Sequence, residues 1–209
     1  MTTCLPALDA PARIREDITK HERRNLLHTL VGLVELAADD WAAVTDRVDE
    51  PLVRALLVGK TVTAAAQGVQ LSVSGTSRLG RGPERPDALI AILGNLIDNA
   101  VDALLECRPP TGDGRRIEVD LCERDTVTEV RVADNGPGVP LEKRQWIFVE
   151  GASTKQPGDG RHRGLGLALV AGLVRERGGT VTVTGPHCGG AVFTVRLPRT
   201  VYAGGREAS

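Results

Sequence analysis

The stretch LGNLIDNAVDALLE, residues 93–106, carries a strong structural signal, because its side chains separate onto two faces of a helix. At about 100° per residue, one face is polar and the opposite face is apolar. The polar face comprises Asn95, Asp98, Asn99, Asp102 and Glu106, and the apolar face Leu93, Leu96, Ile97, Ala100 and Leu104. Asparagine is a poor helix former, so two of them one turn apart favour a specific use over an ordinary solvated face. Their side-chain carbonyl oxygens suit a hard cation such as Mg²⁺.

The next informative stretch is VRVADNGPGVP, residues 130–140, a β-like run that ends in an acidic residue and a glycine-rich turn. Glycines allow the backbone to approach a ligand closely. Asp134 offers an acceptor that could bind an adenine amino group. A DNG turn is also common in β-hairpins, so this stretch indicates a ligand site only in combination with the other motifs.

Further on, GLGLALV at residues 164–170 opens a helix after a loop that contains Lys155, Arg161 and Arg163. A helix N-terminus with closely packed glycines favours phosphate binding. A Rossmann-type dinucleotide site is strongly disfavoured, because the GxGxxG spacing is incomplete and the loop follows no nucleotide-type βαβ strand.

The pattern around these stretches predicts an α+β chain with two parts. Through about residue 68 it is helical, with helices expected over about 9–38 and 50–67, which form a hairpin. From residue 69 onward, short Val- and Thr-rich runs alternate with two helices, which predicts a mixed sheet covered by helices on one face. The expected domains are 1–68, 69–200 and a tail, 201–209.

In the first helix, HERRN at residues 21–25 places a histidine away from the apolar stripe. Asn25 stands where a zinc protease needs a second histidine, so a zinc site is disfavoured. An outward imidazole at His21, with the Glu22 carboxylate beside it, suits phosphoryl transfer to nitrogen. The stripe comprises Leu26, Leu27, Leu30, Leu33, Val34 and Ala37.

Composition narrows the class of protein further. The 209 residues include 26 Lys and Arg against 27 Asp and Glu, so no general attraction to nucleic acid or to a membrane surface is expected. The four cysteines form no CxxC pair, which disfavours a disulfide framework or a zinc cluster. No window approaches a bilayer span and no leader is evident; a cytoplasmic chain is expected.

The segments HERRNLLHTLVGLVELA, residues 21–37, and DEPLVRALLVGKTVTAAAQGVQLSVSG, residues 49–75, resemble the phosphoacceptor hairpin of citrate and C4-dicarboxylate sensor histidine kinases, a sporulation-phosphotransferase-like hairpin. The resemblance implies that His21 is phosphorylated, Glu22 assists and Asn25 positions water for dephosphorylation. Arg23 departs from the family, which usually has an aromatic or apolar residue there.

In order, NLIDNA, DNGPG, IFVEGASTK and GLGLALV resemble the N, G1, F and G2 boxes of the GHKL, or Bergerat, ATP-binding fold. That resemblance implies that Asn95 and Asn99 hold Mg²⁺ and phosphate and that Asp134 contacts adenine. It further implies that Phe148 anchors a lid. The remaining ATP-binding residues that it implies are Gly136, Gly138, Thr154, Lys155, Arg163, Gly164, Leu165 and Gly166.

These resemblances together imply an ATP-dependent protein histidine kinase of a two-component system. Hydrolytic GHKL members place Glu where this chain has Asn95, and Asn cannot activate water. Its expected partners are a second copy, through a four-helix bundle of residues 9–68, and a response-regulator receiver domain; no nucleic acid is expected. The bundle seam would comprise Leu26, Leu30, Leu33, Leu52, Leu56 and Leu57. The alternatives are a phosphorelay phosphotransferase with a degenerate ATPase domain, or an anti-sigma-factor serine kinase.

Overall fold

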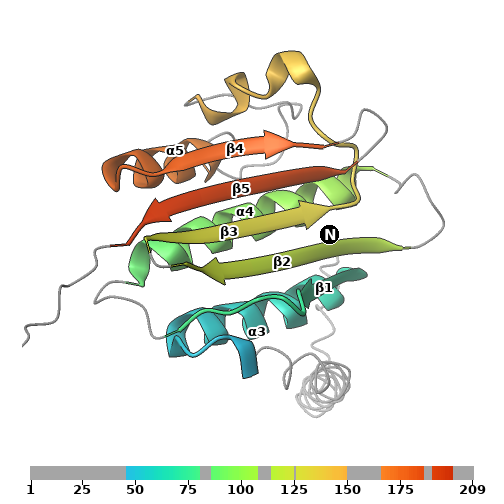
Figure 1. Ribbon diagram of the computed structural model, residues 1–209. Helices are drawn as coiled ribbons and strands as arrows, with labels where there is room; N and C mark the ends of the chain where they lie inside the picture. The colour runs from blue at the N-terminus through green and yellow to red at the C-terminus, as the bar shows by residue number, and fades with distance from the viewer. Residues whose placement is uncertain are drawn as a thin grey trace, which may run out of the picture.

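The computed structural model describes residues 46–80, 86–107, 114–124, 126–149, 166–185 and 190–199. Within them, a five-stranded sheet forms one layer, and helices form a second layer behind it (Figure 1). In chain order the elements are α3 (Pro51–Ala65), β1 (Val69–Val73), α4 (Asp87–Glu106), β2 (Arg115–Glu123), β3 (Val127–Asp134), η1 (Leu141–Lys143), η2 (Trp146–Phe148), α5 (Gly166–Glu176), β4 (Thr180–Thr184) and β5 (Ala191–Pro198).

The sheet is mixed, as the sequence predicts. Its strand order is β1-β2-β3-β5-β4. β1 runs parallel to β2, whereas the other three pairings are antiparallel. Val130 in the middle strand β3 lies opposite Leu121 of β2 and Val195 of β5. All three side chains are fully buried, so this row lies at the centre of the core.

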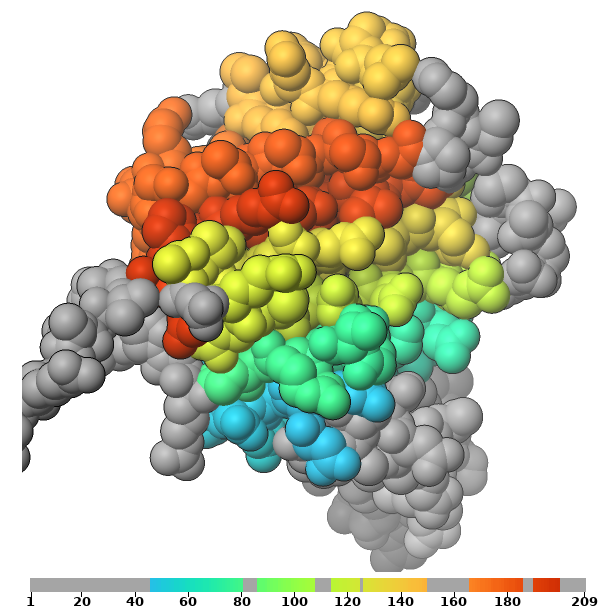
Figure 2. Space-filling view, in the orientation of Figure 1, coloured from blue at the N-terminus to red at the C-terminus, as the bar shows by residue number. Residues whose placement is uncertain are grey.

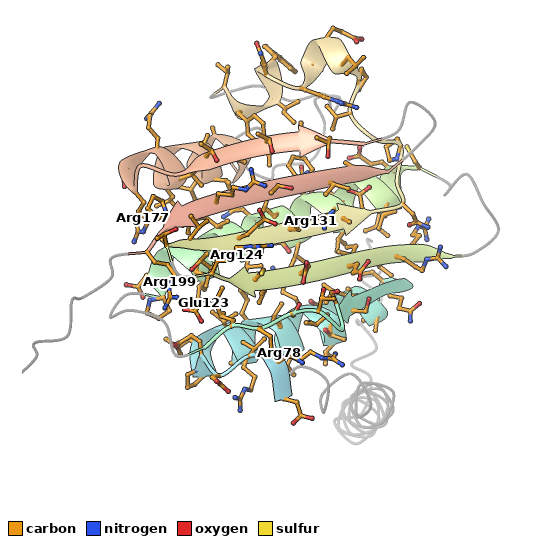
Figure 3. The ribbon with its side chains drawn as sticks, in the orientation of Figure 1. Arg78, Glu123, Arg124, Arg131, Arg177 and Arg199 are labelled. Atoms are coloured by element: carbon orange, nitrogen blue, oxygen red, sulfur yellow. The ribbon has the colours of Figure 1, made fainter. Side chains whose placement is uncertain are left out.

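The two faces of the sheet differ because successive side chains of a strand point to opposite sides. On β2, Ile117, Val119 and Leu121 are buried, whereas Glu118 between them is exposed. The face without helices looks toward the viewer in Figure 2. Figure 3 labels Arg131 on it. The same figure labels further arginines near the end of the sheet away from Asp134: Arg124, Arg177 and Arg199.

Helix α4 supplies the central part of the helical layer. Its predicted apolar residues are all fully buried: Leu93, Leu96, Ile97, Ala100 and Leu104. The helix contacts β2 and β3 of the sheet and lies between α3 and α5. By length and composition α4 is apolar enough to cross a membrane. The expectation that no window approaches such a span is therefore wrong, and the reason is this strongly apolar core face.

Helix α3 is packed into the α/β core, which differs from the role expected for residues 50–67. It contacts β1 and α4. Val53 and Leu57 are completely buried and Ala64 nearly so, in one cluster with the sheet residues. The prediction that Leu57 lies in a dimer seam is wrong, because the monomer already buries it. Leu52, in contrast, is 53% exposed.

The chain before α3 is also tied to this unit. Val48 forms a parallel bridge with Leu79, beyond the end of β1. The Arg54 guanidinium donates to the Val48 carbonyl oxygen through Nε at 2.9 Å and Nη2 at 2.7 Å. The expected helix over 9–38 lies outside the described residues, so the pairing of two helices into a hairpin stays a prediction. The domain boundary predicted between residues 68 and 69 falls between α3 and β1, which share one core.

Candidate nucleotide site

Asp134 stands at the end of β3, where the strand enters the glycine-rich turn. Burial raises the pKa of its carboxyl group above the usual range, although hydrogen bonds from the backbone of Gly136 and Ala191 act in the opposite direction. The Gly136 amide donates to Asp134 Oδ1 at 2.8 Å. Asp134 is half-buried, and its carboxylate can accept a hydrogen bond from a ligand donor such as a purine amino group.

The turn after β3 is held by Asn135, a residue that the sequence analysis did not single out. Asn135 Oδ1 accepts from the Arg116 amide at 2.8 Å, and Nδ2 donates to the Gly114 carbonyl at 2.8 Å. Both partners lie at the start of β2. The side chain therefore fixes the turn to a neighbouring strand, which explains the Asn in the DNG stretch without a ligand.

The glycines of the turn are required by close approach of the backbone. A Cβ on Gly136 would lie 2.9 Å from Asp134 Oδ1. Gly138 has φ +75°, and a Cβ there would lie 2.8 Å from the Gly190 carbonyl oxygen. The Gly190 amide in turn donates to the Gly136 carbonyl at 2.6 Å. Both glycines thus shape the wall beside Asp134.

Asn95 on α4 meets the first residue of α5. A Cβ on Gly166 would lie 2.9 Å from Asn95 Oδ1. Asn95 Nδ2 donates to the Ala91 carbonyl at 2.7 Å, so the amide is oriented and its oxygen points toward the start of α5. The structure thus brings together an Asn predicted to hold Mg²⁺ and a Gly predicted to cradle phosphate, which lie 71 positions apart in the sequence.

Asn99 follows one helical turn after Asn95 and is partly buried. Among the described residues, no group of three or more His, Cys, Asp or Glu is placed to hold a metal ion. The donors available here are amide oxygens. Such a set fits Mg²⁺, which usually retains several waters and is bound together with nucleotide phosphates. Asn95 and Asn99 would then hold the ion, and the ion would neutralise phosphate charge.

Phe148 in η2 is partly buried against the core. Its ring lies edge-on to Phe193 of β5, with centroids 6.3 Å apart and planes at 86°, a favourable aromatic geometry. Element η2 also contacts α5. Phe148 is therefore packed into the core at the position where the family resemblance implies a lid anchor. Its neighbours Trp146 and Val149 remain 44% and 55% exposed.

The other predicted site residues lie outside the described part of the chain. They are His21, Glu22, Asn25, Thr154, Lys155, Arg163, Gly164 and Leu165.

Residues 84–201, more than half of the chain, match the family described as histidine kinase-, DNA gyrase B- and HSP90-like ATPase. The chain belongs to this ATPase family. The α+β fold with a mixed sheet, expected for a GHKL-type ATP-binding domain, is thereby confirmed for the described residues.

Similar curated proteins of this ATPase family's histidine kinase branch are sensor proteins. Sensor protein CitS of Bacillus subtilis is 34% identical over 202 residues, which cover 88% of this chain and 36% of that protein. CitS of Halalkalibacterium halodurans is 32% identical over 197 residues, 86% of this chain and 36% of that protein. Sensor histidine kinase DcuS of Escherichia coli is 30% identical over 196 residues, which cover 85% of this chain and 34% of that protein. The chain spans about a third of the length of these relatives.

Solved structures with the family fold are also similar. The catalytic domain of histidine kinase ThkA, in a nucleotide-free form, has a TM-score of 0.57 at 23% identity, covering 71% of this chain and 91% of that one. Full-length ShkA in complex with AMPPNP has a TM-score of 0.59 at 25% identity, covering 94% of this chain and 41% of that one.

Proposed function

We propose that this chain is the catalytic part of a sensor-type protein histidine kinase, which binds ATP·Mg²⁺ and phosphorylates His21. The observation that carries the proposal is the amide side chain of Asn95, which lies against Gly166 at the start of α5. In hydrolytic GHKL proteins a glutamate activates water at the Asn95 position, and an amide cannot take a proton from water. The site is therefore suited to an acceptor side chain in place of water.

Different residues would bind the base and the phosphates of the nucleotide. Asp134 would accept a hydrogen bond from the adenine amino group, and the glycine-rich turn would line the base. Asn95 and Asn99 would hold the phosphates with Mg²⁺, and α5 would direct its N-terminus at them. Lys155 and Arg163, which the family resemblance implies as lid contacts, would reach the γ-phosphate, and Gly164 with Gly166 would cradle the phosphates. Thr154 and Leu165 are the further ATP-binding residues that the resemblance implies.

The transfer itself forms a nitrogen–phosphorus bond at the His21 imidazole and breaks the bond between the γ-phosphorus and the β–γ bridging oxygen. ADP leaves with the electron pair of that bond, and the imidazole proton passes to Glu22. Phosphoryl transfer depends mainly on positioning and charge neutralisation. Asn25 would place water for the reverse, dephosphorylating reaction.

The partners follow from this chemistry. A phosphoramidate is a reactive phosphoryl donor, so we infer that an aspartate of a response-regulator receiver domain receives the group. The N-terminal segment would join two copies of the chain, with Leu26, Leu30 and Leu33 in the seam. ATP and the free thiols of Cys107 and Cys122 fit a cytoplasmic site. The names of CitS and DcuS as sensor proteins support the same assignment.

The deciding experiment is incubation of the full chain with γ-labelled ATP and Mg²⁺. We expect label that is labile in acid and stable in base, absent from His21→Ala and retained by the matched variant His28→Ala. Acid-stable label would indicate a serine kinase, and absence of ATP binding would indicate a phosphotransferase with a degenerate ATPase domain. Either result would overturn the proposal.

A further inference from the structure

Lys60 of α3 reaches the polar face of α4, where the proposed nucleotide site lies. Its Nζ atom is 2.5 Å from Asp98 Oδ1; the Lys60 side chain is 22% exposed, whereas the Asp98 side chain is 62% exposed. Lys60 follows the buried Leu57 by three residues and precedes the buried Ala64 by four, so it lies beside the buried stripe of α3. Packing of α3 into the core thus holds this ammonium group at α4.

The contact between Lys60 and Asp98 places a positive charge beside a helix whose charged side chains are all negative. Residues 87–106 contain four carboxylates and no Lys, Arg or His. Asp98 lies three residues after Asn95 and directly before Asn99, so its carboxylate is within about one helical turn, roughly 5 Å along the axis, of both amides. A nucleotide triphosphate held by those amides would approach a negative charge of the same helix.

We propose that Lys60 is a positioning residue of the nucleotide site, which neutralises Asp98 and so allows a polyphosphate to be held at Asn95 and Asn99. This inference rests on the proposed function. Lys60 acts through Asp98 and does not touch the nucleotide. An ion pair that only joined α3 to α4 would change the stability of the protein without regard to the number of phosphates on a ligand.

Dependence on phosphate number is therefore the test. Two charges about 8 Å apart at an effective dielectric constant of about 40 interact by an amount equivalent to roughly a fivefold change in affinity. Because Asp98 is partly screened by solvent, we expect Lys60→Met in the full chain to weaken ATP·Mg²⁺ binding by up to about fivefold and ADP·Mg²⁺ binding by less. Adenosine binding should not change. Added salt should reduce the loss, and Lys60→Arg should retain wild-type affinity for all three ligands.

The rescue variant separates neutralisation from direct contact. Asp98→Asn in the Lys60→Met background removes the uncompensated carboxylate, so ATP·Mg²⁺ affinity should return to within about twofold of wild type. A matched control is Arg131→Met, which removes an exposed cation from the helix-free face of the sheet and should leave nucleotide affinity unchanged.

Isothermal calorimetry on folded variants measures each affinity, with circular dichroism to verify folding. An equal loss for adenosine and ATP, or no recovery on Asp98→Asn, would overturn the role of Lys60. Wild-type protein that fails to bind ATP·Mg²⁺ would instead overturn the proposed function, so the two failures are distinguishable.

Discussion

Asn95 Oδ1 lies within 2.9 Å of the position that a Cβ on Gly166 would occupy. This contact joins the polar face of α4 to the first residue of α5. Because the amide is also fixed by its bond to the Ala91 carbonyl, it has little room to move. The geometry of the proposed phosphate site thus depends on the absence of one methyl group.

Gly166→Ala should therefore weaken ATP·Mg²⁺ binding by about tenfold, because the methyl group displaces Asn95. Thermal stability should change little, since alanine is the better helix former and offsets part of the strain. The matched control is Gly172→Ala in the same helix, where nothing lies within 4 Å of the added Cβ. It should stabilise the fold by about 0.5–1 kcal/mol and leave calorimetric affinity unchanged; equal affinity losses for both variants would contradict the contact.

Asp134→Asn should reveal the cost of burying a carboxylate. Burial raises the pKa of Asp134 above its ordinary value of 3.8, so the folded protein binds the proton more readily than the unfolded chain. The stabilisation by the protonated form is complete below about pH 3.8 and is lost as the pH rises through the raised pKa. The variant, which cannot ionise, should gain in stability relative to wild type as the pH rises above about 4, while losing affinity for ATP. Urea unfolding across this range measures the difference; parallel pH profiles for the two proteins would refute the burial effect.

Gly138→Ala should destabilise the protein by about 1–3 kcal/mol, because φ is +75° and alanine is strained in that region. The added Cβ would also lie 2.8 Å from the Gly190 carbonyl oxygen. Gly75→Ala is the control, since its Cβ would have no neighbour within 4 Å. Chemical denaturation of both variants tests this, and similar midpoints would show that the turn adapts freely.

Leu57→Ala should lower the free energy of unfolding by about 2–5 kcal/mol, because a fully buried side chain leaves a cavity. Leu52→Ala on the same helix removes a side chain that is 53% exposed and should change stability by less than about 0.5 kcal/mol. The pair distinguishes a helix of the α/β core from a dimer seam. If both substitutions instead weakened dimerisation equally and left unfolding unchanged, the packing of α3 described above would be refuted.

Elements with a strong local pattern of residues can be predicted from the sequence alone. The two faces of α4 follow from helical periodicity, and all five residues predicted on its apolar face are buried. The alternating runs predicted the strands, and the turn after Asp134 was marked by its glycines. The ordered boxes also indicated the ATPase family, because each box has a short, characteristic pattern of residues.

It takes the folded structure to show which elements share a core and which side chains meet. An apolar stripe at helical spacing predicts that α3 is buried, but it does not show which element covers the helix. The stripe alone suggests a dimer seam for Leu57, whereas in the structure Leu57 packs with the sheet. Lys60 and Asp98 are separated by 38 residues, and Asn135 reaches back 21 residues to Gly114. No local pattern encodes such pairs, because they arise from the packing of whole helices and strands. The contact between Asn95 and Gly166, on which the proposed site depends, is of the same kind.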